Sequence, residues 1–349
     1  MSKTNKILVL VIAVIAVVLI LFGMLSFLHE IPSSTPSSNA LSTAYYALTA
    51  TLGKSYKVTL NMGPDANASL LVGNLNNHQF YVDYSNLYYI EQGNYIIAYP
   101  PGSKEYWGNL SYNLGVLQLT HVTKGPGAIM SNTDRLYYTG GNYTVLLIGT
   151  YSRAPGFGGL SDGYSVALFF TPPRPPINGS INYTQLAINV GMMNWPFHNS
   201  GGIYYPYSTT PYIVVQWEPL WNCYRDSWTT GEFNVWVVHP SPNGTVYVNN
   251  ITLLVGGGGN GFIQNISPGD LIEMMVTYDG YDNTIYATVT NLNTSSTIDL
   301  TLPLYSNFTV PRNGYYWIEV NANPGFDGSN WAIVYLSVFN NVYVQIEKA

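Results

Sequence analysis

The chain has 349 residues, with 12 Lys and Arg and 18 Asp and Glu, so that only 9% are charged, against about 25% in an ordinary soluble protein. A net charge of −6 with so few basic groups excludes nucleic-acid binding by phosphate neutralisation, which needs clustered Lys and Arg. Hydrophobic residues make up 47% of the chain, enough for a large core, and the single cysteine, Cys223, excludes an intrachain disulfide.

The N-terminus carries a candidate membrane anchor. Residues 1–6 include two lysines, and the 22 residues from Ile7 to Leu28 carry no charge. A helix over 7–28 would be about 33 Å long, enough to cross a hydrocarbon core of about 30 Å. A secretory signal has a shorter apolar region and a small-residue cleavage site, and no Ala-x-Ala follows Leu28. The sequence therefore predicts an uncleaved, single-pass anchor in the cell membrane, with residues 1–6 inside, 7–28 in the lipid bilayer and the body extracellular.

Residues 29–43 are predicted to be a Ser/Thr/Pro linker, because PSSTPSSNALST at 32–43 cannot pack a core. The body that follows contains ten Asn-x-Ser/Thr sequons, which suit an exported, glycosylated surface; they begin at Asn67, Asn109, Asn142, Asn178, Asn182, Asn243, Asn250, Asn265, Asn293 and Asn307. The scarcity of ion pairs suits an acidic exterior, where protonated carboxylates form none. On that hypothesis the folded state should be about equally stable from pH 7 down to about 3.

Beyond residue 44 the chain is predicted to be all-β. No apolar stripe of helical period and length follows that residue, and short runs rich in Val, Ile, Tyr, Phe and Thr recur between turn residues. These runs are Lys57–Asn61, Val116–Thr120, Thr144–Thr150, Tyr164–Phe170, Tyr212–Trp217, Phe233–Val238, Leu271–Tyr278, Thr284–Thr290, Thr297–Thr301, Tyr315–Val320 and Trp331–Phe339. Residues 44–104 are predicted to be a β-rich N-terminal extension, and residues 105–349 two packed antiparallel sheets.

Two turn signals stand out within the body. YDGYDNT at Tyr278–Thr284 predicts a hairpin, because the Asp-Gly pair tolerates the positive φ of a tight turn. GGGGN at Gly256–Asn260 predicts a loop. This glycine run lacks the Lys and Ser/Thr of a phosphate-binding loop, so no nucleotide site is assigned to it.

Six segments of the body form an ordered set. They are GVLQLT at Gly115–Thr120, SDGYSVALFFTPP at Ser161–Pro173, GGIYYPYS at Gly201–Ser208, VVQWEPLWN at Val214–Asn222, VTYDGYDNTIYATVT at Val276–Thr290 and TIDLTLPL at Thr297–Leu304. In this order they resemble segments of the legume-type (L-type) lectins, within the concanavalin A-like lectin and glucanase superfamily. The resemblance covers about residues 105–345. It implies a concanavalin A-like antiparallel β-sandwich, or jelly roll, here preceded by one transmembrane helix.

The resemblance also implies a degenerate metal loop. The family's loop holds a Ca²⁺ ion and a transition metal, and Ca²⁺ takes six to eight oxygen ligands. Carried over by position, the possible Ca²⁺ ligands are Glu218, the Leu220 carbonyl, Asn222 and, approximately, Asp226. Gln216 stands where the family has a Glu, and the family's His has no counterpart, although Glu232 lies nearby, so a transition metal is not expected. The open alternative is that Gln216 and Asn222 are hydrogen-bonded groups at a sheet end.

For sugar binding the resemblance implies Asp162, Gly202 and Asn222. A carboxylate accepts hydrogen bonds from two sugar hydroxyls, a glycine allows its backbone N–H to approach closely, and an amide donates. The family stacks an aromatic ring on the sugar at the position of Leu220, and Trp221 or Tyr204 could take that role. The family's peptide bond before this Asp is cis, so a cis Ser161–Asp162 bond is expected. The alternative is an ordinary Asp-Gly turn before a strand.

Hydrolases share this sandwich and remain an alternative. A glycosidase needs two carboxylates about 5–5.5 Å apart if retaining, or about 6.5–9.5 Å apart if inverting. Glu232 and Glu319 are the candidates, and Gln216 with Glu319 could form the Gln/Glu dyad of a glutamic-type peptidase. Asn323 stands where family 12 glucanases have their acid, and the Glu-x-Asp-x-x-Glu strand of laminarinase-type enzymes is absent, which argues against those families.

Together these features predict a membrane-anchored extracellular protein that binds glycans or glycosylated surface proteins without catalysis. The first alternative is an acid-active glycoside hydrolase or glutamic-type peptidase on the same fold. The second is a structural component of a surface coat, favoured by the Tyr- and Asn-rich strands and the degenerate metal loop.

Overall fold

The structure is a computed structural model of the chain. It describes residues 41–42, 45–46, 48–49, 52–53, 55–72, 80–82, 88–92, 95–99, 117–118, 127–131, 136–153, 163–171, 203–204, 208–219, 231–242, 246–261, 263, 266–322 and 329–349. All of them belong to one compact unit that begins at Ser38. None of the helical residues among them forms a segment long and apolar enough to span a bilayer. The expected anchor at 7–28 lies outside the described residues.

Two eight-stranded sheets make up most of this unit. The strands of the first, sheet I, are β1 (Tyr56–Val72), β5 (Leu117–Gln118), β8 (Asn142–Arg153), β15 (Asn260–Gly261), β16 (Leu271–Asp279), β17 (Thr284–Asn291), β18 (Ser296–Pro303) and β20 (Ser329–Lys348). Their order across sheet I is β1-β20-β8-β16-β17-β18-β15, with β5 beside β20. Neighbouring strands of sheet I pair antiparallel.

The second, sheet II, is also antiparallel. Its strands are β2 (Phe80–Val82), β6 (Gly127–Ser131), β7 (Leu136–Tyr138), β9 (Tyr164–Phe170), β11 (Tyr212–Glu218), β12 (Glu232–Val238), β14 (Ile251–Gly258) and β19 (Gly314–Ala322). Their order is β14-β12-β11-β9-β19-β6-β2, with β7 beside β19. Two small ribbons pair β3 (Tyr88–Gln92) with β4 (Tyr95–Tyr99) and β10 (Ile203–Tyr204) with β13 (Val246–Tyr247).

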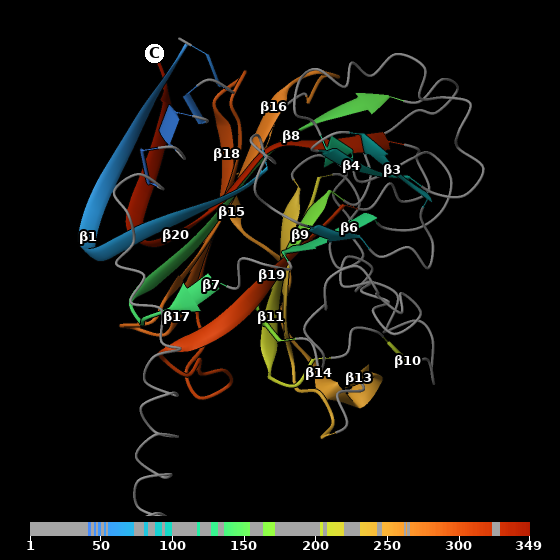
Figure 1. Cartoon of the computed structure of the whole chain (residues 1–349), viewed down its shortest axis with the longest axis vertical. Helices are drawn as coiled ribbons and strands as arrows, with labels where there is room; N and C mark the ends of the chain where they lie inside the picture. The colour runs from blue at the N-terminus through green and yellow to red at the C-terminus, as the bar shows by residue number, and fades with distance from the viewer. Residues whose placement is uncertain are drawn as a thin grey trace, which may run out of the picture. The chain divides into compact units, whose positions relative to one another are not determined.

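Every run that the sequence predicts as a strand overlaps a strand of the structure, so the all-β antiparallel prediction is confirmed. The segment 44–104 contributes to both sheets. β1 lies along β20 at the edge of sheet I, from Tyr56 opposite Lys348 to Val72 opposite Leu336 (Figure 1). β2 pairs with β6 in sheet II.

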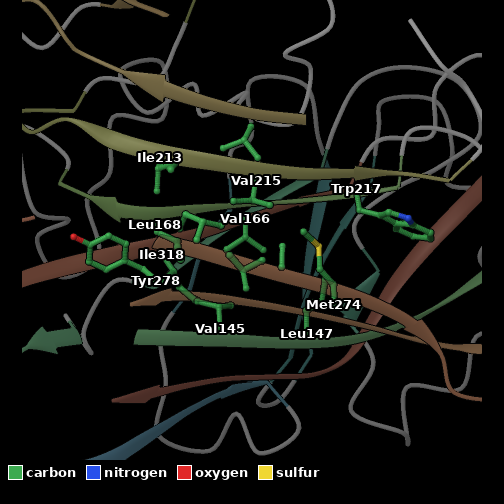
Figure 2. Packing of buried hydrophobic residues seen from close by; sticks show 14 of the residues in the cluster. Val145, Leu147, Val166, Leu168, Ile213, Val215, Trp217, Met274, Tyr278 and Ile318 are labelled. Atoms are coloured by element: carbon green, nitrogen blue, oxygen red, sulfur yellow. The ribbon is translucent and has the colours of Figure 1, made fainter. Parts of the chain in front are cut away.

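The main hydrophobic core combines alternate residues of both sheets (Figure 2). Val145 and Leu147 of β8 and Met274 of β16 belong to the same cluster as Val166 of β9 and Val215 of β11, and all are fully buried. Successive side chains of a strand point to opposite faces, so the residues between these ones face away from the main core. The outer face of sheet II is therefore formed by the alternate residues of β9, β11 and β12.

A helical segment within residues 41–52 was not expected from the sequence. Its three leucines, Leu41, Leu48 and Leu52, are buried in a second hydrophobic cluster. That cluster includes Ile148 of β8, which alternates with the main-core residue Leu147 and therefore lies on the outer face of sheet I.

The helical segment ends at Gly53, whose φ of 77° is left-handed and whose N–H donates to the Thr49 carbonyl at 2.8 Å. Ser, Thr, Ala and two tyrosines, Tyr45 and Tyr46, fill the positions between the leucines and disguise their spacing of seven and four residues. Leu41 lies inside the stretch predicted as a linker, so packed structure begins before residue 44.

The prediction of a loop at Gly256–Asn260 is wrong. β14 continues to Gly258, which pairs with Phe233, and β15 begins at Asn260. The glycines allow the backbone of this strand region to depart from regular β geometry. Gly257 and Gly259 adopt φ values of 70° and 121°, which only glycine adopts readily.

The hairpin at Tyr278–Thr284 is confirmed, since β16 ends at Asp279 and β17 begins at Thr284. The residue with positive φ is Asn283, at 56°, rather than Gly280. A Cβ atom on Gly280 would overlap the Tyr138 hydroxyl, so this glycine is required for close packing and not for turn geometry.

Candidate functional site

The outer face of sheet II carries buried polar side chains. β11 places Val215 and Trp217 in the main core, which turns Gln216 and Glu218 to the outer face, and β9 and β12 alternate in the same way. We call the resulting set the polar row: Ser165, Gln216, Glu218, Glu232 and Asn234. Each of these residues is at most 2% exposed. Buried polar groups of this kind are costly unless they are bonded to a partner or a ligand.

Asn234 is the fixed centre of the polar row. Its Nδ2 donates to Glu218 Oε2 at 3.1 Å, and its Oδ1 accepts from the Gly257 backbone N–H at 2.8 Å. The second bond explains why β14 needs glycine here, because the left-handed Gly257 turns its N–H towards the neighbouring strand's side chain. The glycine run thus holds the amide that orients the Glu218 carboxylate.

Glu218 and Glu232 occupy directly opposite positions of β11 and β12. Residues paired in this way on one face have Cβ atoms about 4.5–5.5 Å apart. Two buried carboxylates at that separation repel each other when both are ionised, so the pair requires a shared proton, a bound cation or a cationic neighbour. This pair is the most chemically distinctive feature of the polar row.

Ser165, Gln216 and Asn234 form a line across three strands, since Gln216 pairs with Ser165 on one side and with Asn234 on the other. The Gln216 Oε1 and the Ser165 Oγ are buried, and neither makes a hydrogen bond within the described part of the structure. Two unsatisfied oxygens beside the carboxylate pair leave this line able to receive a donor or a cation.

One end of sheet II brings three chain segments into close contact; we call this end the rim. A Cβ on Gly163, just before β9, would overlap the Trp217 carbonyl oxygen and lie 2.8 Å from Pro219 Cδ. A Cβ on Gly231, just before β12, would lie 3.1 Å from Trp217 Nε1 and 3.6 Å from Pro219 Cα. Both glycines have positive φ, at 56° and 63°. The rim therefore depends on glycine at both strand starts.

Most of the sugar-site residues inferred from the sequence lie outside the described residues, but their neighbours do not. Asp162 directly precedes Gly163, and Trp221 and Asn222 follow soon after Pro219. Gly163, next to Asp162, and Pro219, three residues before Asn222, therefore meet at the rim. The expected cis bond before Asp162 falls outside the described residues.

Gly202 has a different described neighbour. Ile203 follows it and pairs with Tyr247, one residue before the 3₁₀ turn Val248–Asn250 that leads into β14. That turn lies at the far end of β12, where the His239 N–H donates to the Asn250 carbonyl at 2.8 Å. Gly163 and Pro219 therefore come together at the rim, whereas Ile203, next to Gly202, is not among the residues there.

The possible Ca²⁺ site is described only at Glu218, because Leu220, Asn222 and Asp226 lie outside the described residues. No group of three or more His, Cys, Asp and Glu gathers among the residues that the structure describes. The donors present at this end are the Glu218 and Glu232 carboxylates and the Gln216 amide oxygen. An all-oxygen set fits a hard cation such as Ca²⁺, and the unsatisfied Gln216 Oε1 is compatible with one. The calcium site remains a prediction.

The register separates the two carboxylates that the sequence offered as a hydrolytic pair. Glu319 pairs with Ala167, Ala167 with Val214, and Val214 with Trp236, which is four residues along β12 from Glu232. Glu319 on β19 and Glu232 on β12 are thus three strands apart, which corresponds to about 14 Å across the sheet. Glu319 is thus not a neighbour of Glu232, and it is two strands from Gln216. The carboxylate opposite Glu232 is Glu218.

Sequence reasoning missed Asn234 and Ser165, and it assigned Glu218 and Glu232 to different sites. The available signal was the alternation in YIVVQWE and EFNVWVV, where polar residues recur at every second position of otherwise apolar strands. Their pairing could not be read from the sequence, because the register of β11 against β12 depends on the ends of a long connection.

No protein-family model matches the chain, and no curated protein matches it either. Among solved structures, the chain is similar to peanut lectin with a 9-mer peptide, at 11% identity and a TM-score of 0.42, over 84% of this chain and 99% of that one. It is similar to winged bean acidic lectin complexed with methyl-α-D-galactose, at 10% identity and a TM-score of 0.43, over 80% and 99%. It is also similar to the VIP36 exoplasmic/lumenal domain in its Ca²⁺/Man-bound form, at 11% identity and a TM-score of 0.40, over 74% and 82%.

At these identities and TM-scores the three likenesses carry no argument about this chain. The all-β architecture rests on the two antiparallel sheets themselves. The sugars and the ion in those proteins are theirs, and the residues of this chain must support any site of its own.

Proposed function

We propose that the chain is a membrane-anchored extracellular protein that binds glycans, without catalysis, through an L-type lectin-like site at the rim. The observation that carries the proposal is the close approach of Gly163 to Trp217 and Pro219. It joins the chain next to Asp162 to the chain that leads to Asn222, two residues separated by sixty positions in sequence.

The chemistry of these two side chains suits a sugar. The Asp162 carboxylate would accept hydrogen bonds from two neighbouring hydroxyls, and the Asn222 amide would donate to a ring or hydroxyl oxygen. Trp221 would offer an apolar face for the sugar's C–H groups. A Ca²⁺ ion held by Glu218, Leu220, Asn222 and Asp226 would fix the Asn222 side chain, as the all-oxygen donors at the rim allow.

The proposed location follows from the N-terminal sequence. The apolar segment 7–28 with Lys3 and Lys6 before it supports a single-pass anchor with the body outside the cell. The partners would then be glycans or glycosylated surface proteins. The low content of Lys and Arg supports the absence of a nucleic-acid partner.

A glycan array with the ectodomain tests the proposal. The ectodomain should begin at residue 38, because the buried Leu41 belongs to the packed unit. Asp162→Asn should weaken binding at least about tenfold, since hydrogen bonds to charged groups are worth about 1.5–3 kcal/mol. Asp299→Asn, an exposed site on sheet I, is the matched control and should bind like the wild type. An array with no bound glycan, or equal binding by both variants, would contradict the proposal.

A second candidate, an acid-active glycoside hydrolase, is favoured by one observation: Glu218 and Glu232 lie opposite each other on neighbouring strands. The Cβ spacing of such a pair, about 4.5–5.5 Å, is compatible with the carboxyl separation of retaining enzymes. The Asn234 donor favours an ionised Glu218, which would be the nucleophile, with Glu232 as the acid. Hydrolysis of polysaccharides at pH 3–5 that both Glu218→Gln and Glu232→Gln abolish would establish this activity. A wild type without turnover would eliminate it.

A further inference from the structure

Three sequons of the body have the form asparagine, aromatic residue, threonine, and the structure describes two of them. One is Asn307-Phe308-Thr309, after β18, and the other is Asn142-Tyr143-Thr144, at the start of β8. Their surroundings differ in every respect that matters for modification.

The sequon at 307 presents its two recognition residues to solvent. Phe308 is 2% exposed and belongs to the main core, while Asn307 and Thr309 on either side of it are exposed. The buried Phe308 ring anchors this short segment in the core. The Phe308 carbonyl also accepts a hydrogen bond from Asn283 Nδ2 at 2.9 Å, which fixes the backbone beside Asn307. The Asn307 side-chain amide makes no hydrogen bond within the described structure, so its nitrogen is available to react.

The sequon at 142 is closed. Asn142 and Thr144 are each 2% exposed, and Thr144 Oγ1 lies 2.8 Å from Thr277 Oγ1. In the orientation that satisfies its hydrogen bonds, Asn142 Nδ2 donates to both carboxylate oxygens of Asp279 at 3.0 Å. A glycan on this nitrogen would break those bonds and could not fit beside the neighbouring strands, so a folded molecule cannot carry one.

We propose that Asn307 is an N-glycan acceptor of the folded exported protein and that Asn142 is not. This inference rests on the proposed extracellular location of the body. Tyr305, two residues before Asn307, is 76% exposed, more than any other large hydrophobic residue that the structure describes, and its ring offers a surface for the first sugar.

The reaction is a group transfer from a lipid-linked oligosaccharide pyrophosphate. The Asn307 amide nitrogen attacks the anomeric carbon of the first sugar and forms an N-glycosidic bond. The bond between that carbon and the phosphate oxygen breaks, the lipid pyrophosphate leaves with the electron pair, and the amide loses one proton to a base. No oxidant or reductant is needed, and Thr309 supplies the hydroxyl that sequon recognition requires.

The test is expression of the full chain in a yeast secretory pathway. Purified folded protein is treated with peptide N-glycanase in H₂¹⁸O, which converts each glycosylated asparagine to labelled aspartate. The peptide with Asn307 should carry the label, and the peptide with Asn142 should not. Thr309→Ala should lose the mass of one oligosaccharide, whereas Thr309→Ser, which keeps the hydroxyl, should retain it. Both changes are at an exposed residue and leave Phe308 in the core.

Protease protection in sealed microsomes separates the two ways in which the inference can fail. A protected body with unlabelled Asn307, or with labelled Asn142 in the folded fraction, overturns the inference and leaves the proposed location intact. A body that protease digests in sealed microsomes overturns the proposed location and the acceptor role together.

Discussion

Glu273 gives the fold a pH dependence that can be worked out from its surroundings. It lies on β16 between Ile148 of β8 and Thr290 of β17, and its side chain faces away from the main core. The residue is 5% exposed, and its Oε2 is buried without a hydrogen-bond partner in the described structure. Burial therefore raises the pKa of Glu273 from its ordinary 4.5 to about 8.

The sign and size of the effect follow from linkage. The unfolded chain loses this proton above about pH 4.5, whereas the folded chain keeps it until about pH 8. The contribution of Glu273 is most favourable below pH 4.5, falls as the pH rises towards 8 and is constant beyond that. At about 1.4 kcal/mol per pKa unit, the free energy of unfolding should fall by about 5 kcal/mol across this window. Glu273 should thus make the fold more stable on acidification, whereas the hypothesis of few ion pairs predicts a flat profile from pH 7 to about 3.

Urea unfolding of the wild type and of Glu273→Gln at pH 4, 5, 6, 7 and 8 measures this contribution. Glutamine keeps the shape and cannot ionise, so all other titrations are common to both proteins and cancel in the difference. The variant should gain on the wild type by about 1.4 kcal/mol for each pH unit above 4.5. A difference that stays constant from pH 4 to 8 would refute the reasoning.

Three further outcomes are expected. Asn234→Ala should lower the free energy of unfolding by about 1–3 kcal/mol, because Glu218 and the Gly257 N–H lose a buried partner. Urea unfolding measures this loss. Asn260→Ala, at an exposed residue, is the control and should leave the free energy of unfolding unchanged. Leu147→Ala should cost about 2–5 kcal/mol in the same assay, since the side chain is fully buried in the main core, and a loss under 1 kcal/mol would mean that the sheets do not pack there. Ca²⁺ at 100 times its dissociation constant should stabilise the ectodomain by about 2.7 kcal/mol; an unchanged melting temperature would remove the calcium site.

The strands were predictable because each apolar run is bounded by turn residues and rich in β-branched side chains. The helical segment within 41–52 has no clear helical pattern in the sequence, because Ser, Thr, Ala and Tyr surround its leucines. Its stability comes from packing on sheet I rather than from helix propensity. Gly256–Asn260 was misread because glycine signals a loop more often than it signals an irregularity within a strand. The role of Gly257 becomes clear only from the neighbouring strand, where Asn234 Oδ1 accepts a hydrogen bond from the Gly257 N–H.

The sugar site inferred from the sequence stays a prediction, because Asp162 and Asn222 lie outside the described residues. The structure adds the close approach of Gly163, which follows Asp162, to Pro219, three residues before Asn222. The pairing of Glu218 with Glu232 depends on strand register, a long-range property that no local pattern determines. Glu273 was also beyond prediction, because a glutamate in LIEMMVTY could face solvent or an apolar cluster equally well.

The most direct test of the account is a double-mutant cycle on glycan binding by the ectodomain, with Asp162→Asn, Asn222→Ala and the double variant. Residues that hold one sugar at one rim should be coupled by about 0.5–3 kcal/mol, so the double variant should lose less affinity than the sum of the single losses. Effects that add within about 0.3–0.5 kcal/mol would show that the two side chains act at separate places, and the sugar site at the rim would be refuted.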